Sequence, residues 1–259
     1  MIDINKYFKI ADEINNKVAT FLLEKFGTKK EMFRKTDSHI GIPEDVESNN
    51  EYVNFLEAKS PNAGLYTEEG NKDLKSDMIW VVDSIEGTSN YRSGNPFWAT
   101  QIALLYENDP LLAIVNAPSL NQKFWAMKAR GAFLNGKKIR VNKLKDLGMA
   151  LVDFGRGTKD VDKDWAAITL SNLGRKIRTN RAYGSSGLGI AYCAAGISDA
   201  YLASGGKVYD YLPACLIIRE AGGVALNLKG KDWRMEDPDV LATNEALAGD
   251  ILEVLWKKI

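Results

Sequence analysis

The sequence predicts an α/β protein built in layers of helices and sheets, and three observations indicate this. Residues 4–26 carry apolar side chains at a helical period, with polar residues on the opposite side. Between residues 78 and 138, apolar runs alternate with turn residues, which is typical of neighbouring strands. From about residue 143 onward, short apolar strands alternate with helical segments. We therefore expect a strand-rich half followed by an alternating half.

Two helices are expected before the first strands. The first covers residues 4–26 and serves packing only. The second covers residues 46–56, where Asp45 stands in position to act as the N-terminal cap. The loop between them is basic, and we interpret it as a solvated face, although Arg34 or Lys35 could approach a phosphate.

The rest of the chain follows the same two patterns. An Asn-Gly pair at residues 135–136 predicts a hairpin turn. Asn244 precedes the last helical segment as its expected cap. The remaining expected strands are 78–82, 97–107, 111–117, 123–129, 150–154, 176–179 and 200–203, and the remaining expected helices are 162–173, 183–195, one that begins at Asp210, and 245–259.

Length and composition limit the kind of protein. A chain of 259 residues fits one domain over residues 1–259 or two closely joined lobes with a boundary near 143–150, since no Pro-, Gly- or Ser-rich linker interrupts it. It is 45% hydrophobic, and its 34 basic and 34 acidic residues cancel, so we expect neither a nucleic-acid nor a membrane partner. Without a signal peptide or a membrane-spanning run, we expect a cytoplasmic protein.

Cysteine and histidine usage excludes several chemistries. Cys193 and Cys215 both fall within apolar helical patterns, so we expect buried free thiols rather than a disulfide. His39 is the only histidine, and we interpret it as a surface or capping residue. One histidine removes most zinc-hydrolase, Ser-His-Asp and Cys-His mechanisms.

The stretch from residue 80 to 91, WVVDSIEGTSNY, carries the strongest chemical signal. Asp83 and Glu86 stand on what we expect to be irregular backbone after a strand, with the Ile85 carbonyl between them. An oxygen-only donor set suits Mg²⁺ or Mn²⁺ and not zinc. Gly87 lets the backbone approach a ligand closely, and the residues after it can present N–H groups and hydroxyls to an anion. The alternative is a strand followed by an ordinary polar turn.

Residues 83–88 resemble the Asp-x-Ile-Asp-Gly-Thr motif of the inositol monophosphatase family of Mg²⁺-dependent phosphatases. Glu86 departs from that motif, because the family usually has Asp there. The family also has an Asp before a helix and a Glu-Glu pair after it, which Asp45, Glu68 and Glu69 match. Without the resemblance, we would interpret the two adjacent glutamates as part of a solvated turn.

A second stretch, residues 207–223, resembles the family's Trp-Asp-x-x-Ala helix and its Glu-Ala-Gly-Gly end. Tyr209 replaces the Trp, and Asp210 matches the Asp, for which helix capping is the alternative role. The resemblance extends over essentially the whole chain. It implies the αβαβα five-layer sandwich of the sugar phosphatases, and a homodimer.

The resemblance implies a site for two or three Mg²⁺ ions, for which Mn²⁺ can substitute. Asp83 would bridge two ions. Glu68 and the Ile85 carbonyl would complete the first ion's ligands, and Glu86 with Asp210 would hold the second. Because there is no histidine base, metal ions must supply most of the catalysis.

The resemblance also implies catalytic and substrate-binding residues. Asp45 and Thr88 would orient the attacking water at the metal held by Glu68, so these three are the implied catalytic residues. The implied substrate-binding residues are Gly87, Thr88, Ser89, Gly184, Ser185 and Asp210.

Substrate choice departs from the inositol phosphatases of the family. They use a glutamate in the stretch before the second Asp to bind hydroxyls, and this chain has Ala203 there. Inositol selectivity is therefore in doubt, and another sugar phosphate or fructose 1,6-bisphosphate becomes a candidate. Lys207, Arg156 or Lys159 could meet a second phosphate.

We therefore expect a Mg²⁺-dependent phosphomonoesterase that acts on a small phosphorylated polyol or sugar. The alternative from another class is a catalytically weakened or silent homologue that binds a metabolite or a protein, with Glu86 as its signature. A nucleotide 3′-phosphatase is the alternative within the enzymes.

Overall fold

The computed structural model describes residues 2–34 and 40–256, without the side chains of Ile40, Asn71, Lys72 and Trp256. Lys35 and His39 lie outside the described residues. The helices are α1 (Ile4–Lys25), α2 (Pro43–Lys59), α3 (Thr88–Ser93), α4 (Asp160–Leu173), α5 (Ser186–Ala194), α6 (Val208–Glu220) and α7 (Glu245–Trp256), with 3-10 turns at Pro118–Leu120 and Leu147–Met149.

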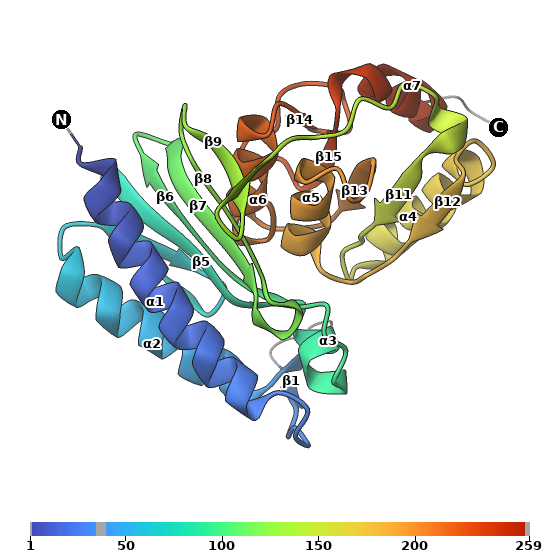
Figure 1. Cartoon of the computed structure of the whole chain (residues 1–259). Coiled ribbons are helices and arrows are strands. Elements are labelled where there is room, and N and C mark those ends of the chain that lie inside the picture. Colours follow the sequence, from blue (N-terminus) through green and yellow to red (C-terminus); the bar gives the residue numbers. More distant parts are fainter. Residues whose placement is uncertain (1, 35–39, 257–259) are drawn as a thin grey trace.

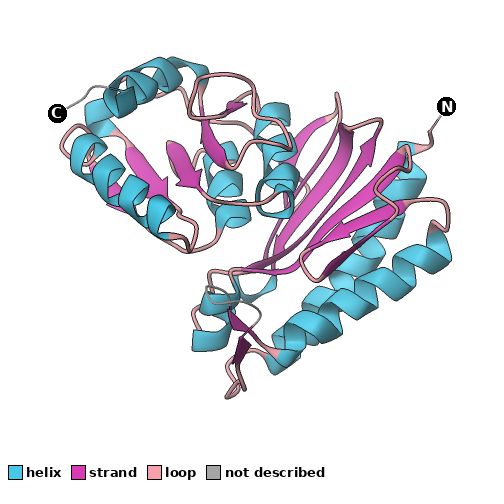
Figure 2. Cartoon of the chain, turned by 180° about the vertical axis from the view of Figure 1, so that it is seen from behind, coloured by secondary structure: helices cyan, strands magenta, loops and turns pink. Residues whose placement is uncertain are grey.

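The elements form five layers, which confirms the predicted αβαβα order (Figure 1). Helices α1 and α2 cover one face of a large sheet. Helices α5 and α6 lie between this sheet and a smaller one, and α4 and α7 cover the outer face of the smaller sheet (Figure 2). No helix among the described residues is long and apolar enough to cross a membrane.

The large sheet of the described chain has the strand order β10-β9-β8-β7-β6-β5-β3-β4. Strands β5 to β10 form an antiparallel meander, whereas β3 runs parallel to β5. Its strands are β3 (Gly64–Thr67), β4 (Gly70–Lys72), β5 (Met78–Glu86), β6 (Ala99–Tyr106), β7 (Asp109–Ala117), β8 (Gln122–Met127), β9 (Gly131–Leu134) and β10 (Lys137–Ile139). A separate two-stranded ribbon pairs β1 (Phe33–Arg34) with β2 (Ile40–Gly41). The Asn-Gly hairpin is confirmed, because Asn135 and Gly136 turn with φ of 49° and 76° between β9 and β10.

The smaller sheet has the order β12-β11-β13-β15-β14 within the described residues. Its strands are β11 (Leu151–Phe154), β12 (Thr179–Arg181), β13 (Ala200–Ser204), β14 (Val224–Leu226) and β15 (Asp239–Thr243). Strand β11 runs parallel to β12 and β13, since helical crossovers connect parallel strands, and β15 runs antiparallel to β13 and β14.

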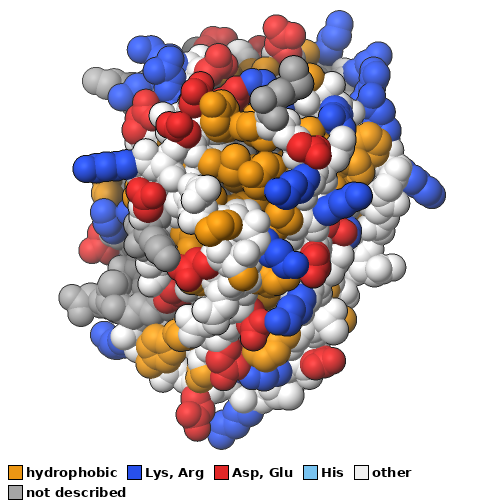
Figure 3. Space-filling model, turned by 90° about the vertical axis from the view of Figure 1, so that its left-hand side faces the viewer, with side chains coloured by type: hydrophobic (Ala, Val, Ile, Leu, Met, Phe, Trp, Pro, Cys, Tyr) orange, Lys and Arg blue, Asp and Glu red, His pale blue; other side chains and the backbone are white. Residues whose placement is uncertain are grey.

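Helices α1 and α2 pack on the large sheet through apolar side chains and face water through charged ones. Val18 and Leu22 of α1 are fully buried in the cluster that contains Trp80 of β5. Burying each such side chain contributes roughly 1.5–3 kcal/mol. On the outer side, Lys17 and Glu51 form an ion pair at 2.5 Å. Figure 3 shows basic and acidic side chains interspersed on one face of the molecule, with hydrophobic ones between them.

The middle layer is apolar on nearly all sides because a sheet covers each of its faces. Helix α6 buries every residue from 211 to 218. Cys193 of α5 and Cys215 of α6 are buried free thiols, as predicted. Burial raises the pKa of Cys215 to about 12 and also raises the pKa of Cys193, so both stay protonated.

Several predicted boundaries differ from the structure. The second helix begins at Pro43 rather than residue 46, so Asp45 lies in its first turn and is not its cap. Strand β5 continues to Glu86, so Asp83 and Glu86 are inside a strand and not on irregular backbone beyond it. Strands β14 and β15 were not predicted. The cap role of Asn244 is confirmed, since its Oδ1 accepts the backbone N–H of Leu247 at 3.0 Å.

Candidate functional site

A bulge in β5 brings the two carboxylates of the central motif to one face of the sheet. Alternate residues of a regular strand face opposite sides, so residues three apart, such as Asp83 and Glu86, would point away from each other. Asp83 pairs with Gln101 of β6 and Glu86 pairs with Ala99, which leaves one extra residue in β5. The Ile85 side chain consequently packs in the cluster under α1 and α2. Asp83 and Glu86 both face the middle helical layer.

Asp83 is the centre of a group of acidic side chains. It is only 3% exposed. Burial raises its pKa well above the usual range, and the negative charges of Glu68, Asp210, Glu86 and Asp45 raise it further. The structure thus brings the five predicted carboxylates into one electrostatic group. They come from four places in the chain.

Asp45 and Thr88 meet at the edge of this group. Asp45 accepts the backbone N–H of Ile42 through Oδ2 at 2.9 Å. Its other oxygen, Oδ1, lies 3.4 Å from the Thr88 hydroxyl oxygen. The same hydroxyl lies 3.1 Å from the carbonyl oxygen of Ile85. The Thr88 hydroxyl therefore lies within hydrogen-bond distance of both a carboxylate and a carbonyl oxygen.

Glu68 lies in the turn between β3 and β4 and is half-buried. Thr67 closes this turn, because its hydroxyl donates to the Gly70 carbonyl oxygen at 2.7 Å. Strand β3 is parallel to and directly beside β5. The turn therefore delivers Glu68 close to the end of the strand that carries Asp83.

Asp210 is the third residue of α6, so it is not the N-cap residue, which is Lys207, but its carboxylate does take part in capping the helix. The Asp210 carboxylate accepts the Lys207 backbone N–H at 2.6 Å. Burial raises the pKa of Asp210 to about 7, and Glu68 adds to the rise. The start of α6 is tied to β6 by Gln101, whose amide donates to the Tyr209 carbonyl at 2.7 Å.

Glu86 reaches across to the start of α5. Its carboxylate accepts the Ser185 hydroxyl and, at 2.5 Å, the backbone N–H of Ser186. It is 5% exposed, and burial raises its pKa to about 8. In this arrangement Glu86 joins the large sheet to the middle layer. The Ser185 hydroxyl and the Ser186 backbone N–H are thereby engaged, and the Ser186 hydroxyl accepts the hydroxyl of Tyr201 at 2.7 Å.

Gly87 turns the chain after β5 with a φ of 88°. A Cβ at this position would lie 3.3 Å from the Phe97 carbonyl oxygen and 3.4 Å from that of Gly184, so a larger residue would be both strained and crowded. Asn90 holds the two loops together, since its amide donates to the carbonyl oxygens of Phe97 at 2.7 Å and Tyr183 at 2.6 Å. Ser89 and Gly184 are exposed beside this contact.

Three residues of the site were not found by sequence reasoning. Asn90 lies inside the central motif, so its position was a usable signal. Gln101 and Ser186 had none, since a polar residue in a strand and a serine at a helix start are ordinary features. Only the packing of α5 and α6 against the large sheet brings them to the carboxylates.

The chemistry of the group is that of a hard-cation site. All the side-chain atoms of the group that could bind a metal ion are carboxylate oxygens, the ligands that Mg²⁺ and Mn²⁺ prefer. Within residues 2–34 and 40–256, no three His, Cys, Asp or Glu side chains are arranged to hold a metal ion as they stand. Three of the carboxylates instead bind backbone N–H groups, at Ile42, Lys207 and Ser186. The donor types fit a cation, and the side chains would have to turn toward it.

Comparisons with known proteins agree with the fold. The profile described as "Inositol monophosphatase family" matches residues 3–259. The Nus factor SuhB of Xylella fastidiosa is 34% identical over 217 residues, which are 83% of this chain and 79% of that protein. Inositol monophosphatase 2 of Solanum lycopersicum is 35% identical over 190 residues, 72% of this chain and 71% of that protein. The solved IMPase of Thermotoga maritima has a TM-score of 0.88 at 26% identity and covers 96% of this chain and 95% of its own.

Proposed function

Because the chain belongs to the inositol monophosphatase family, a family of phosphatases, we propose that it is a Mg²⁺-dependent phosphomonoesterase acting on a small phosphorylated polyol or sugar. The observation that supports the proposal most is the group of carboxylates around the buried Asp83. Five acidic groups that repel one another at a buried position destabilise the protein unless a cation or protons neutralise them.

The residues that would hold Mg²⁺ are Asp83, Glu68 and the Ile85 carbonyl for a first ion, and Glu86 with Asp210 for a second. Bound there, Mg²⁺ would supply positive charge for the phosphoryl oxygens and lower the pKa of a water molecule. The raised pKa of Asp83 supports this assignment, because its largest causes after burial are other members of the same set.

Residues of the chain next to the proposed metal ligands have specific proposed roles in catalysis and phosphate binding. Asp45 Oδ1 and the Thr88 hydroxyl, 3.4 Å apart, would orient a water molecule, and the Asp45 carboxylate would accept its proton. Gly87 keeps side-chain atoms away from the turn, so a phosphate can approach the backbone. The N–H groups of Thr88 and Ser89 belong to the first turn of α3, where no intrahelical acceptor exists for them.

The alcohol side of the substrate has few partners for hydroxyl groups. Ala203 is 1% exposed in β13 and offers no acceptor. Ser185 and Ser186, near the predicted substrate-binding Gly184, already donate to Glu86. We therefore expect no strong preference for inositol 1-phosphate over other sugar phosphates, fructose 1,6-bisphosphate included.

Phosphate release from a panel of esters tests the proposal. The panel contains inositol 1-phosphate, fructose 1,6-bisphosphate, other sugar phosphates and a nucleoside 3′,5′-bisphosphate, each with Mg²⁺, with Mn²⁺ and with chelator. The expected result is metal-dependent release from several sugar phosphates. Preference for the nucleotide would favour a nucleotide 3′-phosphatase, and a preference above about a hundredfold for inositol 1-phosphate would show that another residue binds the ring hydroxyls.

A second candidate function is a silent homologue that binds a protein or a metabolite. Two observations favour it. Glu86 departs from the family motif at an implied metal ligand and is engaged by α5, and one relative is named as a Nus factor rather than as an enzyme. No release from any ester, with either metal, would select this function.

We also propose that the protein is cytoplasmic and, on the strength of the family resemblance, that it is a homodimer. Light scattering on the purified chain distinguishes a mass near 57 kDa, twice the 28.7 kDa of one chain, from that of a monomer. A monomer at micromolar concentration would contradict the dimer and would leave the proposed chemistry unchanged.

A further inference from the structure

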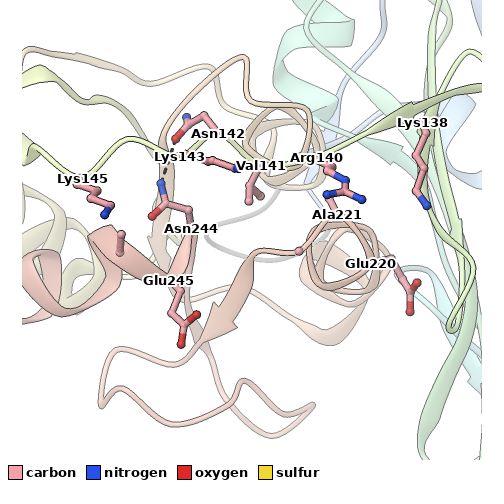
Figure 4. A pocket seen from close by; sticks show the side chains of 12 residues that line it. Lys138, Arg140, Val141, Asn142, Lys143, Lys145, Glu220, Ala221, Asn244 and Glu245 are labelled. Carbon is pink, nitrogen blue, oxygen red and sulfur yellow. Dashed lines mark hydrogen bonds between the residues drawn. The ribbon is translucent and has the colours of Figure 1, made fainter.

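A pocket of about 550 Å³ lies at the junction of the two sheets (Figure 4), and none of the five carboxylates lines it. We call it the linker pocket. Its walls come from β10, from the connecting residues 140–145, from the C-terminal end of α6 and from the N-terminal end of α7. The phosphatase site uses the opposite end of α6, where Asp210 lies. The proposed function therefore leaves the linker pocket unexplained.

The pocket is lined by four basic side chains, Lys138, Arg140, Lys143 and Lys145. Figure 4 shows Lys145 and Lys138 toward its two ends, with Arg140 between them. All four are exposed, and none of them forms an ion pair with a described residue. Other lysines of the chain do find partners, as Lys123, Lys128 and Lys163 show. The positive charge of the pocket is therefore uncompensated by ion pairs.

Two acidic residues also line the pocket, and one of them is already satisfied. The Glu220 carboxylate accepts the backbone N–H groups of Ala129 at 2.7 Å and Gly131 at 2.8 Å, one through each oxygen. Glu245 lies in the first turn of α7. The pocket thus has four basic and two acidic side chains. Of the two acidic ones, Glu220 is held by its hydrogen bonds to the loop at residues 129–131.

The backbone that carries the cations is held in place. The Val141 N–H donates to the Ala221 carbonyl at 3.2 Å, which fixes the connecting segment to the end of α6. The Asn244 amide donates to Asn142 Oδ1 at 3.0 Å and to the Leu144 carbonyl at 2.9 Å, which fixes it to the start of α7. A ligand would meet a pocket whose backbone is already held in place, so binding would have to order only the basic side chains.

We propose that the linker pocket binds a small molecule with two or more phosphate groups, and that it does so without a metal ion. Its volume is within the range of small-molecule sites. Several cations around one hollow suit a compact polyanion, because each adds a charge-assisted hydrogen bond. The balanced net charge of the chain, 34 basic against 34 acidic residues, argues against a long nucleic acid.

Such a ligand would connect parts of the molecule that belong to different sheets. Lys138 belongs to β10 of the large sheet, while α6 and α7 pack on the small sheet and in the middle layer. Binding should therefore stabilise the junction of the sheets against unfolding. The ligand would also contact one end of the helix whose other end carries Asp210.

Inorganic pyrophosphate in excess chelator is the probe, measured by titration calorimetry on the whole chain. Chelator suppresses binding at the carboxylate group, which repels anions when no cation is present. The test variant is Arg140→Gln with Lys143→Gln. The matched control is Lys137→Gln, because Lys137 is the exposed neighbour of Lys138 on β10 and does not line the pocket.

The natural chain is expected to bind pyrophosphate, and the double variant should raise the Kd at least about tenfold, since each lost charge-assisted hydrogen bond contributes on the order of one such factor. The Lys137→Gln and Asp83→Asn variants should bind as the natural chain does. Thermal unfolding without pyrophosphate is measured for every variant. The double variant and Lys137→Gln should unfold at the same midpoint as the natural chain, which would show that the double variant loses affinity without losing its fold.

Three outcomes overturn the proposal. The first is no binding by the natural chain, and the second is an equal Kd in the double variant. The third is affinity for an RNA homopolymer, but not for pyrophosphate, that depends on Arg140 and Lys143, because this would make the pocket part of a nucleic-acid surface. No ester hydrolysis is measured, so these results stand apart from the success or failure of the proposed phosphatase activity.

Discussion

At the scale of single residues, the site depends on where each carboxylate finds a hydrogen-bond donor. The sequence identified Asp83 and Glu86 as neighbours, yet a regular strand would have placed them on opposite faces. The bulge that unites them is not visible in the sequence, because it depends on the pairing of β5 with β6. Similarly, the reach of Glu86 to Ser186 depends on how α5 packs beside the large sheet.

The first prediction concerns the extra methylene of Glu86. Glu86→Asp withdraws the carboxylate by roughly 1.5 Å, about one C–C bond, from Ser185 and Ser186. Mg²⁺ demands near-octahedral geometry at roughly 2.0–2.1 Å, so we expect the natural chain to need more Mg²⁺ than the variant and to respond well to Mn²⁺. Phosphate release measured against metal concentration compares the two proteins.

Ser185→Ala is the matched control for that comparison. It removes one partner of Glu86 while leaving the carboxylate at full length, so we expect a smaller shift in metal requirement in the same direction. If Glu86→Asp changes neither the metal requirement nor kcat, Glu86 is an equivalent ligand and the geometric argument is wrong.

The second prediction concerns Asp153 in β11, which is not among the carboxylates that raise the pKa of Asp83. Burial raises its pKa to about 6, against 3.8 for an exposed Asp, although the Tyr183 N–H partly offsets the rise. The folded protein therefore holds this proton more tightly than the unfolded chain does. Stability should fall as the pH rises from about 4 to 6, and the cost above pH 6 is on the order of 2–3 kcal/mol.

Asp153→Asn removes this titration and should unfold at higher denaturant than the natural chain at pH 7, with a smaller difference at pH 4. Urea unfolding at both pH values measures it. Exposed Asp164→Asn on α4 serves as the control, and its difference from the natural chain should not change with pH in this way. An Asp153→Asn variant that is equally destabilised at pH 4 and pH 7 would contradict the assignment.

At the scale of elements, apolar patterning located α1, α4 and the meander within a few residues, and α6 was recognised as a continuous apolar segment that follows Asp210. Apolar patterning failed where tertiary contacts determine which residues form a strand. Strands β14 and β15 are short and are defined by their pairing with β13 and with each other. The start of α2 at Pro43 also differs from the prediction, since the first turn carries Pro43, Glu44 and Asp45 instead of an apolar pattern.

The third prediction tests the packing of α5 against the large sheet. A Cβ at Gly187 would lie 2.2 Å from Gln101 Oε1, and Gln101 is held by the Tyr209 carbonyl, so it has little room to move. Gly187→Ala should therefore destabilise the fold by about 1–3 kcal/mol, the usual cost of overpacking. Chemical denaturation measures the change.

Gly249→Ala in α7 is the matched control, because no atom lies within 4 Å of its added Cβ. It should raise stability by about 0.5–1 kcal/mol, the usual gain for Gly to Ala within a helix. Equal effects of the two substitutions would show that the contact between α5 and β6 is looser than the distances indicate.

At the scale of the whole molecule, the layered order followed from the resemblance of separated motifs, whereas composition alone gave only an α/β protein. The carboxylates meet because β5 ends, and α2 and α6 begin, near the β3–β4 turn of the large sheet. Asp83 and Asp210 are 127 positions apart in the sequence, and no local pattern relates them. Their proximity depends on α6 packing against the large sheet, where Gln101 of β6 ties its start.

The last prediction is that metal-dependent turnover depends on both of these residues. Asp83→Asn and Asp210→Asn each remove a charge that a bound cation needs, so each should lower kcat by on the order of a hundredfold or more while the chain stays folded. Asp239→Asn is the control, because Asp239 lies on β15 and binds the Leu228 N–H at 2.7 Å. Near-normal activity in either test variant would make that residue structural.

The most direct test of the account is phosphate release by the natural chain across a Mg²⁺ titration that begins in excess chelator, with Asp83→Asn measured beside it. The account predicts no turnover in chelator, a saturable rise with Mg²⁺, and a loss of about a hundredfold or more in the variant. Full turnover of the natural chain in excess chelator, or equal rates for the two proteins, would contradict a phosphatase that works through cations held around Asp83.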